Sequence, residues 1–146
     1  MSDRLTHECG LAFVRLRKPL HHYQEVYGDA AWGLRKTYLL MQKQYNRGQD
    51  GAGLGVVKFD MPAGDQFLLR IRSDKHNAIE RIFDAITEDT EELSEAITQG
   101  SEMDAKRSCR FLGEAYLGHL RYGTHSSNSM ANCHPFIRKR NIASRN

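Results

Sequence analysis

The sequence predicts a single domain of the α+β class. Its 146 residues are enough for one sizeable hydrophobic core. Segments rich in β-branched and aromatic residues lie on both sides of segments with helical spacing, and Pro and Gly stand where a hairpin must reverse. Strands on both sides of helices, joined by tight turns, favour α+β over strict α/β alternation.

Four segments have the composition of strands. The first starts at or just after Cys9 and ends before Pro19. A turn at Met61–Asp65 separates the second from the third, so we expect these two to form a hairpin. The expected strands are Cys9–Leu16, Leu54–Phe59, Gln66–Arg72 and a segment near Ala115–Tyr122.

Two helices are predicted from the spacing of apolar residues. In residues 30–45 the stripe is Leu34, Tyr38, Met41 and Tyr45, and in residues 77–99 it is Ile79, Ile82, Phe83 and Ile86. The polar segments before and after these helices, 19–29 and 100–108, are predicted as connections.

The composition is that of an ordinary soluble protein and excludes several classes. The formal net charge is +3, and the basic runs at 15–18 and 138–140 lack interleaved aromatics, so no nucleic-acid partner is expected. No apolar run is long enough for a transmembrane helix or a secretory signal, which favours a cytoplasmic protein without a membrane partner. The three cysteines form no CxxC pair and are expected to be free thiols.

Three segments combine residues that could carry chemistry: Cys9-Gly10, RGQDGAG at 47–53, and GHLRYGTHSS at 118–127. Each also has a plain structural explanation. A lone cysteine is most often a small buried hydrophobe, and the glycine-rich segment could be a simple connection. His119 and Arg121 alternate along a strand, so both could lie on one solvated face.

A metal site is not expected. The residues that could act as ligands lack the spacing of zinc modules. They are His7, Cys9, His119, His125, Cys133 and His134.

Taken together, the segments CGLAF, QYNRGQDGAGLGVV, GHLRYGT and CHPF resemble, in this order, the glutaminase domain of class II glutamine amidotransferases. These enzymes are N-terminal-nucleophile (Ntn) hydrolases. The resemblance covers residues 9–136 and is closest to the amidophosphoribosyltransferase family, which acts in purine biosynthesis. Thr124-His125 also resembles the glucosamine 6-phosphate synthase type, so that alternative stays open.

The chemistry of such a family suits these residues. A thiolate attacks the amide of glutamine better than water does, and the resulting thioester releases ammonia before it is hydrolysed to glutamate. A cysteine at a chain terminus carries its own base, because its free α-amino group can take the thiol proton near neutral pH.

The resemblance implies a role for individual residues. Cys9 matches the nucleophile, and Arg121 matches the arginine that holds the α-carboxylate of glutamine. Thr124 and His125 match further substrate contacts. Arg47 and Gly48 match the loop packed beside the nucleophile. His119 matches a supporting position.

The implied fold is a four-layer α-β-β-α sandwich, of which this chain would form part. Residues 1–8 are expected to be a propeptide and residues 9–146 an incomplete amidotransferase domain, because the Asn-Gly pair that forms the family's oxyanion hole is missing. The acceptor domain would be a partner absent from the chain. The resemblance implies no cofactor here, Mg²⁺ only in the phosphoribosyl domain, and a homo-oligomeric full-length protein.

A different class of function remains open. A chain that lacks oxyanion donors could be a catalytically inactive module that binds glutamine or regulates another domain. Release of ammonia that depends on Cys9 distinguishes the enzyme from this module.

Overall fold

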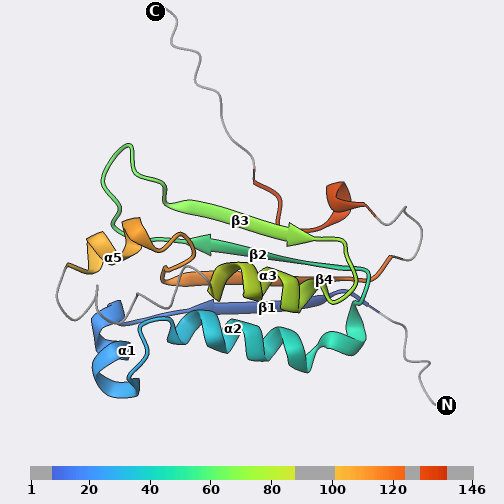
Figure 1. The fold of residues 1–146 in the computed structure, drawn as a ribbon, viewed down its shortest axis with the longest axis horizontal. Helices are drawn as coiled ribbons and strands as arrows, with labels where there is room; N and C mark the ends of the chain where they lie inside the picture. Colours follow the sequence, from blue (N-terminus) through green and yellow to red (C-terminus); the bar gives the residue numbers. More distant parts are fainter. Residues whose placement is uncertain (1–7, 88–100, 124–128, 138–146) are drawn as a thin grey trace, which may run out of the picture.

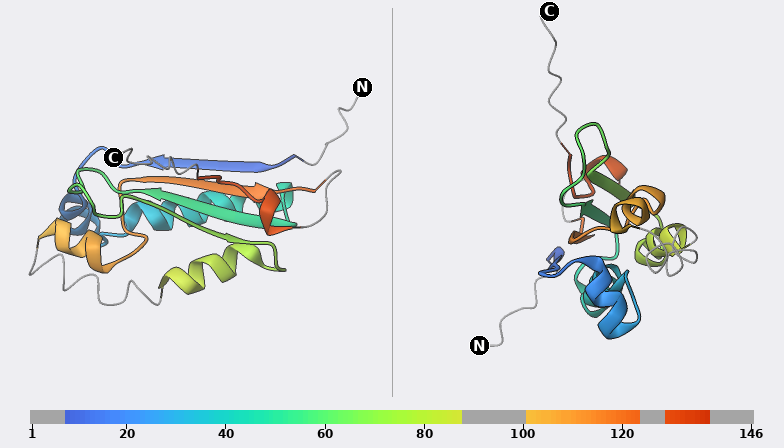
Figure 2. Two further views of the ribbon diagram at one scale, coloured as in Figure 1. Left: turned by 90° about the horizontal axis from the view of Figure 1, so that it is seen from above. Right: turned by 90° about the vertical axis from the view of Figure 1, so that its left-hand side faces the viewer.

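A computed structural model describes residues 8–87, 101–123 and 129–137 of the chain (Figure 1). Within these residues, four strands form one antiparallel sheet in the order β1–β4–β2–β3. Helices α2 (Trp32–Lys43) and α3 (Ala78–Thr87) pack on one face of this sheet (Figure 2). The prediction of an α+β domain is confirmed.

All four predicted strands are present. Their bounds are Gly10–Arg15 for β1, Gly51–Val57 for β2, Leu68–Ser73 for β3 and Ala115–Arg121 for β4. Strands β2 and β3 form the hairpin predicted around the turn at 61–65. Strand β2 begins three residues earlier than predicted, inside the glycine-rich segment, because Gly51 already pairs with Arg121 of β4.

Both predicted helices exist, with shorter bounds. Helix α2 ends at Lys43, and residues Tyr45–Arg47 form a separate 3₁₀ turn, so Tyr45 lies outside the helix. The apolar stripe of α3 is buried as predicted, through Ile79, Ile82, Phe83 and Ile86. The remainder of the predicted segment, from residue 88 to 99, lies outside the described residues.

Two predicted connections are helices instead. Helix α1 (Leu20–Tyr27) forms in the segment after Pro19 because Leu20 and Tyr23, three residues apart, are buried on one side. Helix α5 (Glu102–Ser108) begins at Ser101, whose hydroxyl accepts a hydrogen bond from the Asp104 N–H at 3.1 Å. The segment has no helical pattern of apolar residues, and the serine that can cap a helix is the feature of its sequence that indicates one.

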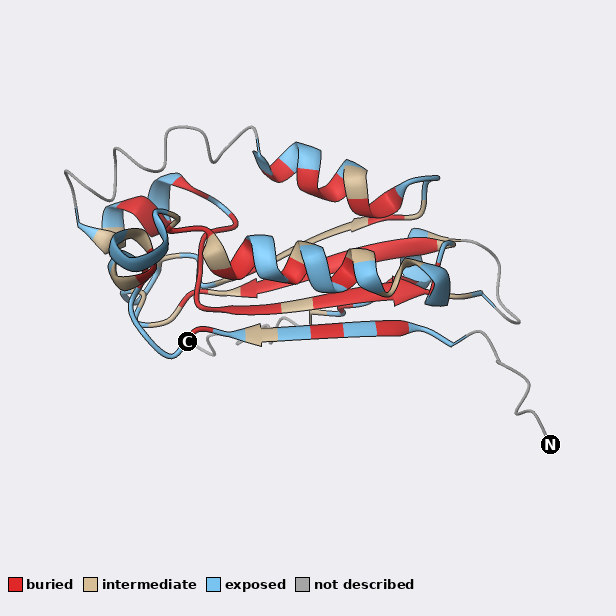
Figure 3. Cartoon of the chain, turned by 90° about the horizontal axis from the view of Figure 1, so that it is seen from below, coloured by how far each residue is buried: buried red, intermediate tan, exposed pale blue. Residues whose placement is uncertain are grey.

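The sheet has two different faces. The inner face, toward α2 and α3, carries buried apolar side chains, among them Leu54, Val56, Tyr116 and Leu120. Along β1 buried and exposed residues alternate (Figure 3). Ala12 is buried, while Leu11 and Phe13 on the outer face are each 62% exposed. This alternation is the period-2 pattern of a strand with one covered face.

Candidate active site

Cys9 immediately precedes β1 and carries an exposed free thiol. Strand β1 pairs with β4 so that Gly10 faces Leu120. Continuing this register by one residue places Cys9 opposite Arg121, on the outer face of the sheet. The Tyr122 N–H donates to the Cys9 sulfur at 3.5 Å, and the thiol in turn donates to the Tyr122 carbonyl oxygen at 3.9 Å.

The Arg47-Gly48 loop lies against the same end of β4. Gly48 is extended and buried, and a Cβ atom added there would lie 2.7 Å from the Leu120 carbonyl carbon and 2.8 Å from that of Arg121. Only glycine permits this approach, since any side chain would collide with backbone. Arg47 is exposed at the end of the 3₁₀ turn. The Arg47-Gly48 loop and Cys9 therefore both lie at the same end of β4.

Arg121 is 4% exposed and belongs to the outer face of the sheet, between Cys9 and the start of β2. Its guanidinium lies near Gly123, because a Cβ atom added at Gly123 would be 3.5 Å from Arg121 Nη2. Gly123 itself is exposed to solvent. The simple alternative of a solvated face for Arg121 is wrong.

His119 is also buried, at 8% exposure, and its Nδ1 has no hydrogen-bond partner among the residues that the structure describes. Its ring stands 4.9 Å from the ring of His134, which in turn contacts Phe136 at 4.2 Å between centroids. Burial, together with the nearby His134 and Arg121, lowers the pKa of His119 to about 4. His119 is therefore neutral at physiological pH and forms part of the wall beside Arg121.

Residues Cys133–Phe136, the covering segment, run across the outer face over β2. A Cβ atom at Gly53 would overlap the His134 carbonyl oxygen, so the segment sits directly on the strand backbone. Arg72 of β3 donates to the Cys133 carbonyl oxygen at 2.8 Å. Cys133 itself is fully buried, and burial raises the pKa of its thiol. The covering segment closes the outer face next to Arg121 and His119.

The structure thus brings together Cys9, the Arg47-Gly48 loop and Arg121, which are separated by more than 100 positions at the extremes. The other two predicted substrate contacts, Thr124 and His125, lie outside the described residues. Asp50 was not singled out from the sequence, although it stands inside RGQDGAG. Its carboxylate accepts from the Gly123 N–H at 2.8 Å, which only the tertiary structure reveals.

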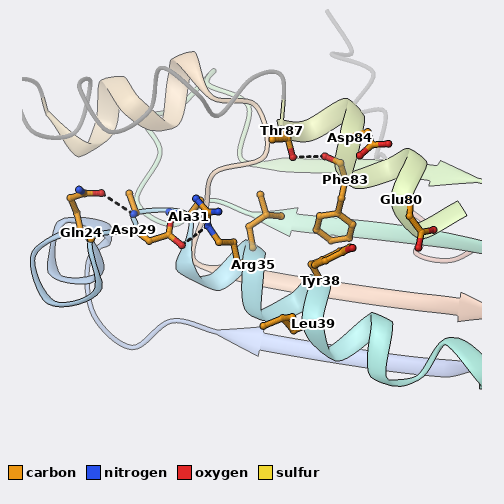
Figure 4. A pocket seen from close by; sticks show the side chains of 13 residues that line it. Gln24, Asp29, Ala31, Arg35, Tyr38, Leu39, Glu80, Phe83, Asp84 and Thr87 are labelled. Carbon is orange, nitrogen blue, oxygen red and sulfur yellow. Dashed lines mark hydrogen bonds and ion pairs between the residues drawn. The ribbon is translucent and has the colours of Figure 1, made fainter. Parts of the chain in front are cut away.

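A separate cavity of about 770 Å³ lies in the helical layer between α2 and α3 (Figure 4). Its walls include the Asp29–Arg35 ion pair at 2.6 Å and the aromatic pair Tyr38–Phe83, with ring centroids 4.8 Å apart. None of its lining residues belongs to the segments around Cys9. The apolar stripes predicted the packing of these helices but not this opening between them.

Within residues 8–87, 101–123 and 129–137, no group of three or more His, Cys, Asp or Glu side chains could hold a metal ion. Over the same part of the chain, no helix combines the length and the apolar character that crossing a membrane requires. Comparisons of the chain with protein-family models, with curated proteins and with solved structures find no significant match.

Proposed function

We propose that this chain is a glutamine-hydrolysing domain of the class II amidotransferase type, most similar to amidophosphoribosyltransferases, with Cys9 as its nucleophile. One observation carries the proposal: the exposed Cys9 thiol contacts Tyr122 of the GHLRYGT segment, and the RGQDGAG loop packs on the same end of β4.

The proposed reaction uses the thiol and its own backbone nitrogen. After the Glu8–Cys9 bond is cleaved, the free α-amine takes the thiol proton. The sulfur attacks the side-chain carbonyl carbon of glutamine, a thioester forms, and the C–N bond breaks to release ammonia. Water then hydrolyses the thioester to glutamate and restores the thiol.

Arg121 is proposed to bind the α-carboxylate of glutamine. A guanidinium can hold a carboxylate through two parallel hydrogen bonds, which fixes its orientation. Because Arg121 is almost fully buried, the carboxylate would enter beside the exposed Gly123. Thr124 and His125, which follow directly in the chain, are proposed as further substrate contacts.

The four-layer Ntn-hydrolase sandwich is proposed as the complete fold. Its support is the outer face of the sheet, where Leu11 and Phe13 are each 62% exposed and Phe136 is 56% exposed. A second sheet stacked on this face would bury these side chains, as sheet-on-sheet packing requires.

The proposal can be tested with a chloroketone analogue of glutamine, in which CH₂Cl replaces the amide nitrogen. The Cys9 sulfur displaces chloride and forms a thioether, so a single labelling event reports both binding and nucleophilicity. We expect Cys9 to be labelled, free glutamine to slow the labelling, and a chain that begins at Cys9 to react faster than the full chain. Peptide mass spectrometry locates the label.

Two variants control this experiment. Arg121→Lys should lose most of the protection by glutamine, since one ammonium cannot replace the guanidinium fork. The exposed Arg110→Lys should behave as the parent does. Labelling that glutamine does not slow would overturn the proposal. Protection by glutamine without any release of ammonia from glutamine itself would instead identify a binding module.

A further inference from the structure

Asp50 forms hydrogen bonds to the residues on both sides of Tyr122. It is the last residue before β2, and its backbone N–H donates to the Arg121 carbonyl oxygen at 3.0 Å. Its side-chain Oδ2 accepts from the Gly123 N–H at 2.8 Å. One aspartate therefore holds the residue before Tyr122 and the residue after it.

Tyr122, held in this way, presents its own N–H to the Cys9 sulfur at 3.5 Å. An N–H donor stabilises a thiolate more than a thiol, because hydrogen bonds to charged groups are about twice as strong as neutral ones. Any displacement of Tyr122 would weaken this bond, since hydrogen-bond energy falls steeply with distance and angle. The reactivity of the sulfur should therefore depend on how firmly the 121–123 backbone is held.

The loop that carries Asp50 is itself packed closely on β4. The backbone at Gly48 lies too near Leu120 and Arg121 for any side chain, and Gly51 pairs with Arg121 in the sheet. Asp50 lies between these two fixed points. Its carboxylate is thereby held beside the residues that follow β4 and adds one side-chain hydrogen bond beyond the end of the β2–β4 ladder.

We propose that Asp50 is a positioning residue that holds the Tyr122 amide against the Cys9 sulfur through its hydrogen bonds to Arg121 and Gly123. The inference rests on the proposed function only in treating Cys9 as the nucleophile. The added claim is that Asp50 influences the reactivity of the Cys9 thiol without contacting the sulfur or the proposed substrate.

The test is the rate at which iodoacetamide alkylates Cys9 in the full chain at a fixed pH. The sulfur attacks the CH₂ carbon and iodide leaves, so no glutamine chemistry is involved. Cys109 and Cys133 are buried, and peptide mass spectrometry assigns the modified residue. Asp50→Ala should slow the alkylation by about fivefold, the loss expected for one hydrogen bond. Asp50→Asn should restore most of the rate, because its amide oxygen can still accept from Gly123.

Two further variants separate the proposed role of Asp50 from a general structural effect on the alkylation rate. The control Asp65→Ala removes a surface ion pair to Arg107 and should leave the rate unchanged. If Asp50→Ala does not fold, Asp50→Glu keeps the charge but displaces the carboxylate, and it should slow the alkylation in the same way.

A folded Asp50→Ala or Asp50→Glu chain that reacts as fast as the parent would overturn the inference. Equal slowing by Asp50→Asn and Asp50→Ala would also overturn it, because charge rather than the hydrogen bond would then be responsible. Failure of glutamine protection in the chloroketone experiment leaves this measurement intact, so the two proposals fail separately.

Discussion

The two faces of the sheet are built from the same strands but carry opposite chemistry. On β4, Tyr116 and Leu120 point toward the helices and are buried among apolar groups, whereas His119 and Arg121 point to the outer face. The inner face is covered by whole helices, while the outer face is covered over β2 by the short segment Cys133–Phe136. The comparison shows that side chains at alternate positions of one strand have different roles: those on the inner face stabilise the fold, and those on the outer face belong to the proposed site.

The largest expected effect is on the inner face. Tyr116 is fully buried, and its hydroxyl donates to the Gly113 carbonyl oxygen at 2.7 Å. Tyr116→Ala should lower the free energy of unfolding by about 3–5 kcal/mol, because it leaves a cavity and unsatisfied backbone groups. The matched aromatic on the outer face is the exposed Phe13, and Phe13→Ala should cost about 0.5 kcal/mol or less. Denaturant titration measures both, and equal losses would refute the contrast between the faces.

The next largest effect is on the pH dependence of stability, through His119 on the outer face. His119 binds its proton with a pKa of about 4 in the folded chain, against about 6.5 when unfolded. Between these values the unfolded state binds more protons, so stability should fall as the pH is lowered from about 6.5 to 4. This histidine should contribute at most about 3 kcal/mol to that loss, and nothing above pH 6.5.

The variant His119→Leu isolates this contribution. It should flatten the pH dependence of unfolding between pH 6.5 and 4 relative to the parent chain. The exposed His76→Asn serves as the control and should follow the parent curve. If the parent and His119→Leu curves run parallel across this range, the folded chain does not keep His119 neutral and the prediction is wrong.

A smaller effect is expected at the covering segment. Gly53→Ala places a methyl group on the His134 carbonyl, so residues 133–136 must move away at a cost of about 1–3 kcal/mol. Cys133, fully buried in the parent, should then react with a thiol reagent. Gly55→Ala meets only the Pro135 ring, at 2.9 Å, and should expose Cys133 less. If the parent and both variants are labelled at Cys9 alone, the covering segment is not held by the strand backbone.

Much of the fold could be predicted from local patterns. The strand that follows Cys9, the turn at 61–65 and the apolar stripe of α3 all depend on neighbours within a few residues, and each is present in the structure. Helices α1 and α5 were missed because burial of Leu20 and capping by Ser101 outweigh a polar composition. The role of Asp50 cannot be predicted from local patterns, because its hydrogen-bond partner, Gly123, is 73 residues away in the chain.

Local sequence patterns were sufficient to predict the strands, the main helices and the three segments from which a glutaminase-like site is proposed. Periodicity and turn chemistry act over short stretches of chain, so they can be read without a fold. The strand pairing places Cys9 opposite Arg121, tertiary packing buries His119 in its neutral form, and the folded chain brings the Asp50 carboxylate to the Gly123 N–H. These properties depend on strand order and register, which are set by packing of the inner face across the whole chain.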